Sequence, residues 1–277
     1  MIQEIFPHKF DNHYSGNLMP DDDSIVFHFQ EGKVLSCSDS QNPFPKYSQI
    51  KIPDCLVYLF SVDERKYFLL LDTVAIPPEN YSYREAKTIR HAENVVKLNV
   101  FVLFTALHLW KWYMNNRFCG FCGGDTVIDS QERALVCVHC RRKIYPRLNP
   151  AVIVGVTDGD RLLITRYARN KGVSYDALVA GFTEIGETLE ETVEREVMEE
   201  VGLKVKNIRY YKSQPWGFSG GILAGFYCDT DGSSEINLDV SELSSAEWVQ
   251  KSDIKGQPDN FSLTNEMMIN FKNSESV

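Results

Sequence analysis

The stretch of chain between Gly181 and Leu203 contains eight glutamates and a single arginine. Because an α-helix turns by about 100° per residue, Glu196 and Glu200 would lie one turn apart on one flank of a helix, with Glu199 beside them. Carboxylates at this spacing repel one another, and hard divalent cations that bind their oxygens offset the repulsion. Mg²⁺ or Mn²⁺ held in this way can bridge phosphate oxygens and activate a water molecule. The pattern therefore indicates metal-assisted phosphate chemistry, with a solvated acidic helix face as the alternative.

The same stretch contains apolar residues at every fourth position, which predicts a helix with one buried stripe. Gly202 is placed to end this helix as its C-cap. The residues of the stripe are Leu189, Val193, Val197 and Val201.

Four of the seven cysteines form two C-x-x-C pairs, Cys119 with Cys122 and Cys137 with Cys140. Two such pairs can supply four thiolates to one tetrahedral ion, which leaves no open position for catalysis. The spacing therefore predicts a structural zinc site in a reducing compartment, and we expect a cytoplasmic protein. The other three cysteines are predicted to be small core residues: Cys37, Cys55 and Cys228.

The surrounding sequence indicates mixed elements. Strands are predicted near residues 24–29, 55–60 and 66–71, then a helix from about Arg84 to Asn116. Strands at 151–156 and 161–165 flank a turn at 158–160, and further strands reach about Trp248 before a helical tail from Asn260. The apolar run from Leu98 to Trp110 is too short to span a bilayer, so we expect a buried helix and no membrane anchor.

The composition narrows the class of protein. The chain has 277 residues and a net charge of −9, which argues against a generic nucleic-acid coat. A local basic run is present at Arg141, Arg142, Lys143 and Arg147. No secretory leader is expected at the N-terminus.

The glutamate stretch matches G-x5-E-x7-R-E-U-x-E-E-x-G-U at every specified position and so resembles the Nudix box. The resemblance implies an α+β (α/β) fold in which a mixed β-sheet lies between helices. With the cysteine pairs, the order resembles the NAD(H) pyrophosphatase branch of that family. We therefore expect an N-terminal α+β domain at 1–116, a zinc ribbon at 117–146 and a Nudix domain at 147–277.

The resemblance also implies roles for matching residues. Arg195 and Glu187 would brace the loop before the helix. The catalytic metals would be held by the Ala180 carbonyl and by Glu196, Glu199, Glu200 and Glu242. The group that takes the proton from the attacking water is left open. A homodimer is expected as well.

Residues 213–219 resemble the S-Q-P-W-P-F-P-x-S signature of NADH pyrophosphatases, but Gly217 and Ser219 replace two prolines. A loop without them is expected to be looser. The expected substrate residues are Gln214, Pro215, Trp216, Gly217, Phe218, Ser219, Gly220, Gly221, Phe182, Tyr145, Glu132, Arg84 and Thr264.

The reaction implied is hydrolysis of NADH or NAD⁺ to NMNH or NMN and AMP. Three alternatives stay open: ADP-ribose or diadenosine polyphosphates as substrates, removal of an NAD cap from RNA, and a non-catalytic Nudix-like nucleotide sensor. An intact set of box glutamates argues against the sensor.

Overall fold

The computed structural model describes residues 1–39, 41–50, 56–71, 77–168 and 175–274, and Cys55 lies outside this part of the chain. Contacts divide the chain into two compact units. The first unit contains Met1–Ile2, Leu148–Trp216 and Gly221–Val277. The second unit contains Gln3–Arg147 and Gly217–Gly220.

The second unit is built on a six-stranded sheet with the order β1-β4-β5-β2-β3-β6. Its strands are β1 (Phe10–Asp11), β2 (Ile25–Gln30), β3 (Lys33–Ser36), β4 (Leu56–Val62), β5 (Arg65–Leu70) and β6 (Ser82–Glu85), with a short 3-10 helix, η1, at Tyr47–Gln49. Strands β2, β4 and β5 coincide with the predicted strands in the described part of the chain. Aromatic side chains such as Phe27, Phe60 and Phe68 are fully buried in this sheet's core.

The helical stretch predicted from about Arg84 to Asn116 consists of two helices, α1 (Ala86–Arg90) and α2 (Lys97–Asn115). Arg84 pairs with Val34 as part of β6, so helical structure starts later than predicted. Asn94 has a positive φ of 55°, which interrupts a right-handed helix between α1 and α2.

Helix α2 is a core helix, as predicted. Ten of its 19 residues are buried, and Phe101 and Trp110 pack against Phe10 and Phe29 of the sheet. Among the helices of the described chain, none is both long and apolar enough to cross a membrane.

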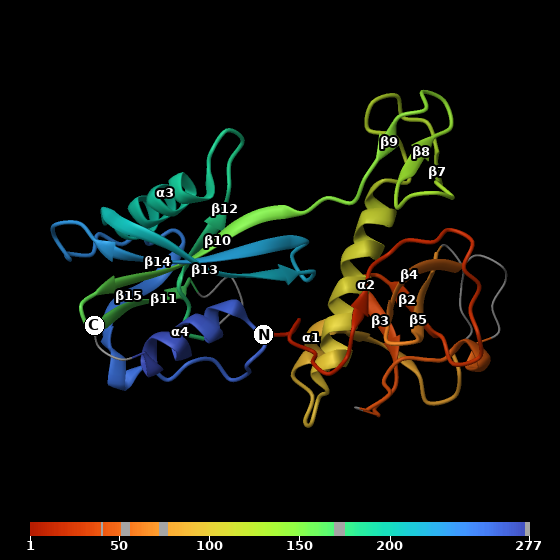
Figure 1. Ribbon diagram of the computed structural model, residues 1–277, viewed down its shortest axis with the longest axis horizontal. Helices are drawn as coiled ribbons and strands as arrows, with labels where there is room; N and C mark the ends of the chain where they lie inside the picture. The colour runs from red at the N-terminus through yellow and green to blue at the C-terminus, as the bar shows by residue number, and fades with distance from the viewer. Residues whose placement is uncertain (40, 51–55, 72–76, 169–174, 275–277) are drawn as a thin grey trace. The chain divides into compact units, whose positions relative to one another are not determined.

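A small sheet of β7 (Thr126–Ile128), β8 (Leu135–Cys137) and β9 (Lys143–Ile144) follows α2 (Figure 1). These strands are antiparallel and short, and they join the two cysteine pairs.

The first unit contains a mixed sheet with the order β13-β14-β10-β11-β15, and β12 also pairs with β10. Its strands are β10 (Asn149–Asp158), β11 (Arg161–Tyr167), β12 (Val179–Phe182), β13 (Val205–Trp216), β14 (Gly221–Thr230) and β15 (Leu243–Gln250). Strands β10 and β14 are parallel, whereas β10 and β11 are antiparallel.

Two helices cover opposite faces of this sheet, α3 (Leu189–Val201) and α4 (Leu263–Asn273) (Figure 1). Val152 and Val154 of β10 pack with Val193 and Val197 of α3. Ile153, between them in sequence, packs with Leu263 and Met267 of α4, because successive side chains of a strand point to opposite faces. A 3-10 helix, η3 (Lys251–Asp253), precedes α4. The predicted sandwich of a mixed sheet between helices is confirmed.

Candidate active site

The glutamate helix is fixed at both ends by its own sequence. Thr188 accepts a hydrogen bond from the Glu191 N–H (3.1 Å), and the Glu191 carboxylate accepts one from the Thr188 N–H (2.8 Å). This reciprocal capping box satisfies two N–H groups that have no partner inside the helix. At the other end Gly202 has φ +69°, the left-handed conformation of the predicted C-cap. The capping box and Gly202 therefore set the two ends of the helix that carries Glu196, Glu199 and Glu200.

Arg195 on α3 contacts carboxylates of the helix and of the loop before it. Its Nε and Nη2 donate to the two oxygens of Glu187 (2.5 and 3.0 Å), and Nη2 also donates to the Phe182 carbonyl (2.9 Å). Its Nη1 donates to Glu196 (2.8 Å) and Glu199 (3.0 Å). Hydrogen bonds from Arg195, and then from the Glu184 N–H, lower the pKa of Glu187 to about 2. One guanidinium thus connects β12, the loop and the helix.

Glu196 lies in a space that a glycine leaves open. A Cβ on Gly181 would lie 1.9 Å from the Glu196 carboxyl carbon, so no other residue fits at position 181 without displacing that carboxylate. Burial raises the pKa of Glu196, Arg195 opposes this, and the nearby Glu199 and Glu242 raise it further. Glu196 is therefore a partly desolvated carboxylate that faces other acids.

Glu200 and Glu242 complete the acidic group. Glu200 is only 3% exposed, although its side chain ends in a carboxyl group. Burial, and then the charges of Glu200, Glu242 and Glu196, raise the pKa of Tyr167 on β11 to about 12. Two carboxylates of α3 and one just before β15 thus act on the same tyrosine.

This donor set fits a divalent cation. Glu196, which accepts from Arg195, acts electrostatically on Tyr167 together with Glu200 and Glu242, and carboxylate oxygens are the donors that Mg²⁺ and Mn²⁺ prefer. A cation bound here would neutralise phosphate charge and lower the pKa of a water molecule.

The other expected site residues of the first unit lie on β12, β13, β14 and α4. Ala180 pairs with Ile153 in the β12–β10 ladder, and the Phe182 side chain, which follows two residues later, is 53% exposed. Gln214 is buried at the end of β13, where its amide donates to the Phe261 carbonyl (2.8 Å) and accepts from the Leu263 N–H (2.7 Å). The remaining expected residues of this unit are Pro215 and Trp216 on β13, Gly221 on β14 and Thr264 on α4.

Residues 217–220 belong to the second unit and lie against α2. Lys111 Nζ donates to the Phe218 carbonyl (2.7 Å), and the rings of Phe104 and Phe218 are 5.8 Å apart. A Cβ on Gly217 would lie 2.0 Å from the Phe104 carbonyl oxygen, so the signature's proline does not fit here. Contacts with α2, instead of proline rings, hold this loop. Ser219 is exposed and Gly220 is buried.

Three further expected substrate residues also lie in the second unit. Arg84 on β6 donates to the Cys37 carbonyl. Glu132 pairs with Lys143 and shares a hydrogen bond with Tyr145. The structure thus places Glu132 and Tyr145 together and Arg84 elsewhere in the unit.

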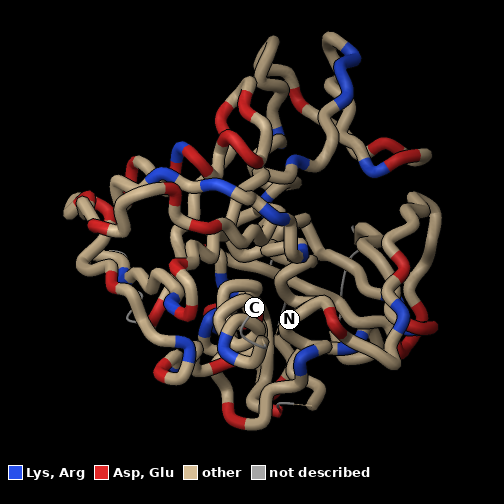
Figure 2. The backbone as a smooth tube through the Cα atoms, turned by 60° about the vertical axis from the view of Figure 1, so that its left-hand side comes forward, with Lys and Arg blue, Asp and Glu red and all other residues tan. Residues whose placement is uncertain are grey.

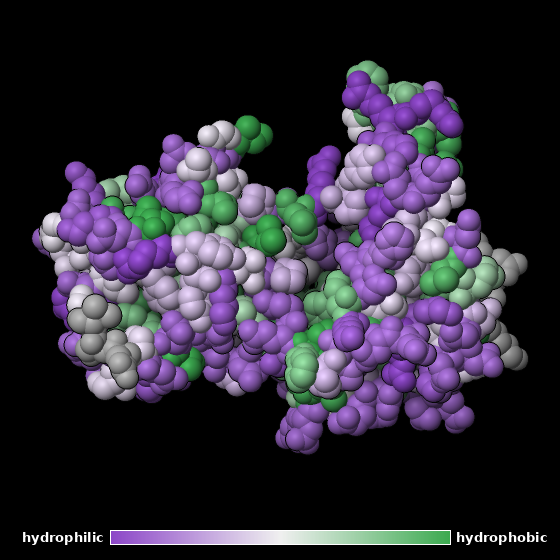
Figure 3. Space-filling model, in the orientation of Figure 1, coloured by the Kyte–Doolittle hydropathy of each residue, from purple (hydrophilic) through white to green (hydrophobic). Residues whose placement is uncertain are grey.

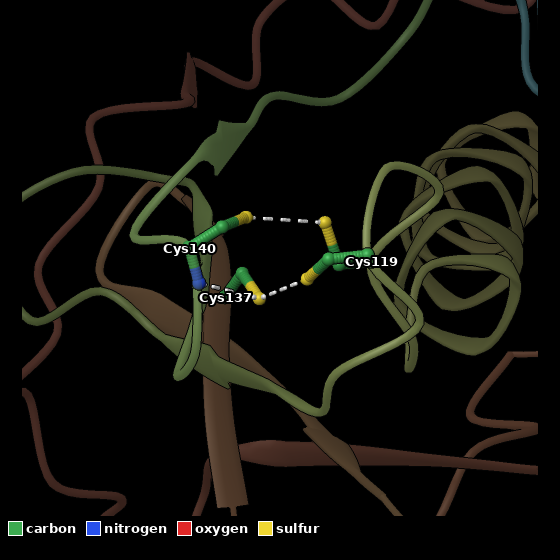
Figure 4. Close-up of side chains that lie close together, drawn as sticks. Cys119, Cys137 and Cys140 are labelled. Atoms are coloured by element: carbon green, nitrogen blue, oxygen red, sulfur yellow. Dashed lines mark hydrogen bonds between the residues drawn. The ribbon is translucent and has the colours of Figure 1, made fainter.

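The four paired cysteines converge on one point (Figure 4). Their sulfurs all lie within 4.8 Å of one another, and no other group of three or more metal-ligating side chains in the described chain is as tight. The Sγ atoms of Cys119 and Cys140 are 3.6 Å apart and those of Cys122 and Cys137 are 3.4 Å apart. Four thiolates around Zn²⁺ would lie about 3.8 Å from one another, so the cluster fits zinc. Backbone N–H groups, first that of Cys140, lower the pKa of Cys137 to about 6, which favours its thiolate.

Sequence reasoning missed Tyr167, Gly181 and Lys143 as parts of these arrangements. Gly181 opens the Nudix-like pattern, which was a usable signal, but nothing in the sequence connects Tyr167 with the glutamates. Lys143 was visible only as a member of a basic run, whereas it pairs with Asp129 and Glu132.

A mixed sheet between two helices, with the acidic helix and its arginine brace, defines a Nudix domain. Residues 147–268 match the NUDIX domain model, and residues 115–145 match the NADH pyrophosphatase zinc ribbon domain. The chain therefore carries a Nudix domain preceded by a zinc ribbon of the NADH pyrophosphatase type.

Named relatives match about half of the chain. The chain is 43% identical over 148 residues to the NAD-capped RNA hydrolase NudC of Enterobacter sp. (strain 638) and 42% identical over 148 residues to that of Salmonella heidelberg (strain SL476). Each match covers 53% of this chain and 57% of the relative, so the chain spans little more than half the length of these proteins. A NUDIX hydrolase structure from Nitrosomonas europaea is 19% identical, with a TM-score of 0.48 over 56% of this chain and 90% of that chain.

Proposed function

We propose that this protein hydrolyses the pyrophosphate bond of NADH or NAD⁺ to give NMNH or NMN and AMP, and the same bond in the NAD cap of RNA. The observation that carries the proposal is the glutamate helix α3, in which one guanidinium, that of Arg195, donates to Glu187, Glu196 and Glu199. Relatives that are 40–43% identical over the matched 148 residues are named NAD-capped RNA hydrolases. This similarity supports the substrate class.

The chain's own residues divide the work. Glu196, Glu200 and Glu242, with the Ala180 carbonyl, would hold Mg²⁺ or Mn²⁺, which neutralises the pyrophosphate and lowers the pKa of water. Arg195 and Glu187 keep Glu196 and the loop in place through the hydrogen bonds described above. The exposed ring of Phe182 next to this network is suited to stack on a flat base. Glu199 is exposed and accepts from Arg195 (3.0 Å), and it would help to hold the metals or take the proton of the attacking water.

A second candidate, hydrolysis of ADP-ribose or diadenosine polyphosphates, is favoured by one observation. Gly217 and Ser219 replace two prolines of the NADH signature. The substrate loop therefore differs in its chemistry from that of the branch it resembles, while the metal-binding glutamates do not. A non-catalytic sensor is disfavoured because every glutamate of the pattern is present.

The test compares kcat/KM for NADH, NAD⁺, ADP-ribose, diadenosine compounds and NAD-capped RNA in Mg²⁺ and in Mn²⁺. Glu200→Gln is expected to abolish turnover. Glu194→Gln is the matched control, because Glu194 is an exposed residue of the same helix and the substitution removes the same charge. Preference for NADH, NAD⁺ or capped RNA supports the proposal. Preference for ADP-ribose overturns the substrate but keeps the chemistry, and absence of turnover would favour the sensor.

We also infer a cytoplasmic homodimer with one structural Zn²⁺ per chain. Four converging thiols suit a reducing compartment. The dimer rests on the resemblance to the NAD(H) pyrophosphatase branch, and light scattering of the purified protein tests it. Metal analysis of the same sample tests the zinc.

A further inference from the structure

The two cysteine knuckles interlock and present their tips together. The Val138 N–H donates to the Asp125 carbonyl (2.9 Å), and Gly124 packs so closely on the His139 ring that an added Cβ would lie 2.6 Å from its Nδ1. The exposed residues at these tips form a surface that we call the knuckle face. It consists of Phe121, Val138, His139, Arg141 and Arg142.

An aromatic ring and a guanidinium stack on this face. The Phe121 side chain is 67% exposed, and the guanidinium carbon of Arg142 lies 3.7 Å from the centroid of its ring. Large apolar side chains that face water cost free energy, and the space-filling view shows apolar residues among polar ones over β7–β9 (Figure 3). A flat ring with a planar cation beside it is the kind of platform on which nucleic-acid bases stack.

The segment that contains the knuckle face is positively charged. Residues 117–147 contain six Lys or Arg and three Asp or Glu, a net charge of +3 in a chain of −9, whose acidic residues are spread over both units (Figure 2). Asp129 and Glu132 both pair with Lys143, so their charge is already balanced. Arg141 and Arg142 have no acidic partner among the described residues and stay available to phosphates.

We propose that the knuckle face binds the single-stranded RNA that follows an NAD cap, with a base stacked on Phe121 and phosphates near Arg141 and Arg142. The proposal rests on the proposed function for the identity of the capped substrate, but it concerns a surface that shares no residue with the glutamates proposed to hold the metals. Single strands suit it because only unpaired bases can stack on a protein ring.

A purely structural role for the two arginines is the competing explanation. Zn²⁺ with four thiolates has a net charge of −2, and nearby cations would offset it. That role predicts that removing the arginines weakens zinc retention and leaves RNA binding by zinc-loaded protein unchanged. In that role the Phe121 ring serves only to hold the guanidinium of Arg142.

The experiment measures binding of an uncapped 5′-labelled single-stranded RNA to the full, zinc-loaded protein by fluorescence anisotropy at several salt concentrations. Phe121→Leu is expected to weaken binding about 5- to 150-fold, the range for one lost base stack, whereas Phe121→Tyr keeps the ring and the affinity. The double variant Arg141→Gln/Arg142→Gln is expected to lower the salt slope by about 1.4, since each neutralised phosphate contributes about 0.7 for single strands. Gln replaces Arg141 without a new backbone penalty, because both residues face the same positive φ (61°).

The matched control is Lys33→Gln/Lys255→Gln, which removes two exposed positive charges elsewhere. Unaltered RNA binding by the knuckle-face variants, an equal loss in the control, or preference for an acidic peptide over RNA would overturn the proposal. Hydrolysis separates it from the proposed function. The knuckle-face variants should lose kcat/KM on NAD-capped RNA and keep it on free NAD⁺, whereas a protein that binds RNA but hydrolyses neither substrate would refute only the proposed function.

Discussion

At the scale of single residues, the site depends on the space that Gly181 leaves for Glu196 as much as on the charges of its carboxylates. Gly181→Ala is expected to push the Glu196 carboxylate out of place, because the added Cβ would lie 1.9 Å from it. A displacement of about 1 Å can cost about 100-fold in rate, so kcat/KM should fall about 10- to 100-fold while the protein stays folded. Steady-state kinetics over a range of Mg²⁺ concentrations measures this. Gly120→Ala is the control, because a Cβ there meets nothing within 4 Å, and an unchanged kcat/KM for Gly181→Ala would contradict the account.

The ion pair between Glu187 and Arg195 makes a prediction about pH. Arg195 lowers the pKa of Glu187 to about 2, below its ordinary value, so the pair stabilises the folded state wherever the carboxylate is ionised. This contribution is fully present above about pH 4.5 and is lost as the pH falls toward 2. Urea unfolding should therefore show Glu187→Gln less stable than wild type at about pH 7, with the difference narrowing at about pH 3.5. Glu190→Gln, an exposed change in the same helix, should show no such narrowing.

At the scale of elements, the capping box decides where α3 begins. Thr188→Ala removes the hydroxyl that accepts from the Glu191 N–H, which is expected to lower the free energy of unfolding by about 1 kcal/mol. Thr188→Ser keeps the hydroxyl and should keep most of the stability. Chemical denaturation of the three proteins measures the difference. Equal losses for alanine and serine would show that the methyl group, and not the cap, matters.

The spacing of apolar residues predicted some helices and strands better than others. The four-residue repeat of Leu189, Val193 and Val197 predicted α3 well, because one apolar stripe and one glycine cap specify a helix locally. The helical stretch expected from about Arg84 begins at Ala86, because Arg84 pairs with Val34 in a sheet, which apolar spacing does not register. Sheet pairing joins segments distant in sequence, so no local pattern reveals it.

At the scale of the whole molecule, the zinc ribbon should fold around its ion independently of the Nudix domain. Cys137→Ser removes one of four converging sulfurs and is expected to abolish stoichiometric zinc, since structural zinc and folding are coupled in such sites. Hydrogen exchange should speed up in β7–β9 and stay unchanged in α3 and β10. Cys228→Ser is the control, because this buried cysteine lies in β14, outside the cluster. Retention of zinc by Cys137→Ser would rule out the four-thiolate site.

The division into units also limits what sequence order can predict. Expected substrate residues are contiguous from Gln214 to Gly221, yet contacts assign residues 217–220 to the second unit. The geometry of Gly217 against the Phe104 carbonyl explains a departure from the signature that the sequence alone could only register as a loss of proline. The space available at position 217 depends on packing against a residue distant in sequence, which local propensity does not describe.

The first residues of the chain give the last prediction, because they belong to the first unit although residues 3–147 do not. The Ile2 N–H donates to the Phe261 carbonyl (3.0 Å), its side chain is 1% exposed, and Met1 packs with Leu263 and Met267 of α4. Ile2→Ala should therefore destabilise the first unit by about 2–4 kcal/mol through the lost burial, and Ile2→Val by about 1 kcal/mol. Hydrogen exchange read by mass spectrometry should show lost protection in α4 and β14 with none lost in β2 and β5. Loss confined to the second unit would mean that Ile2 stabilises the sheet of β2 and β5 instead.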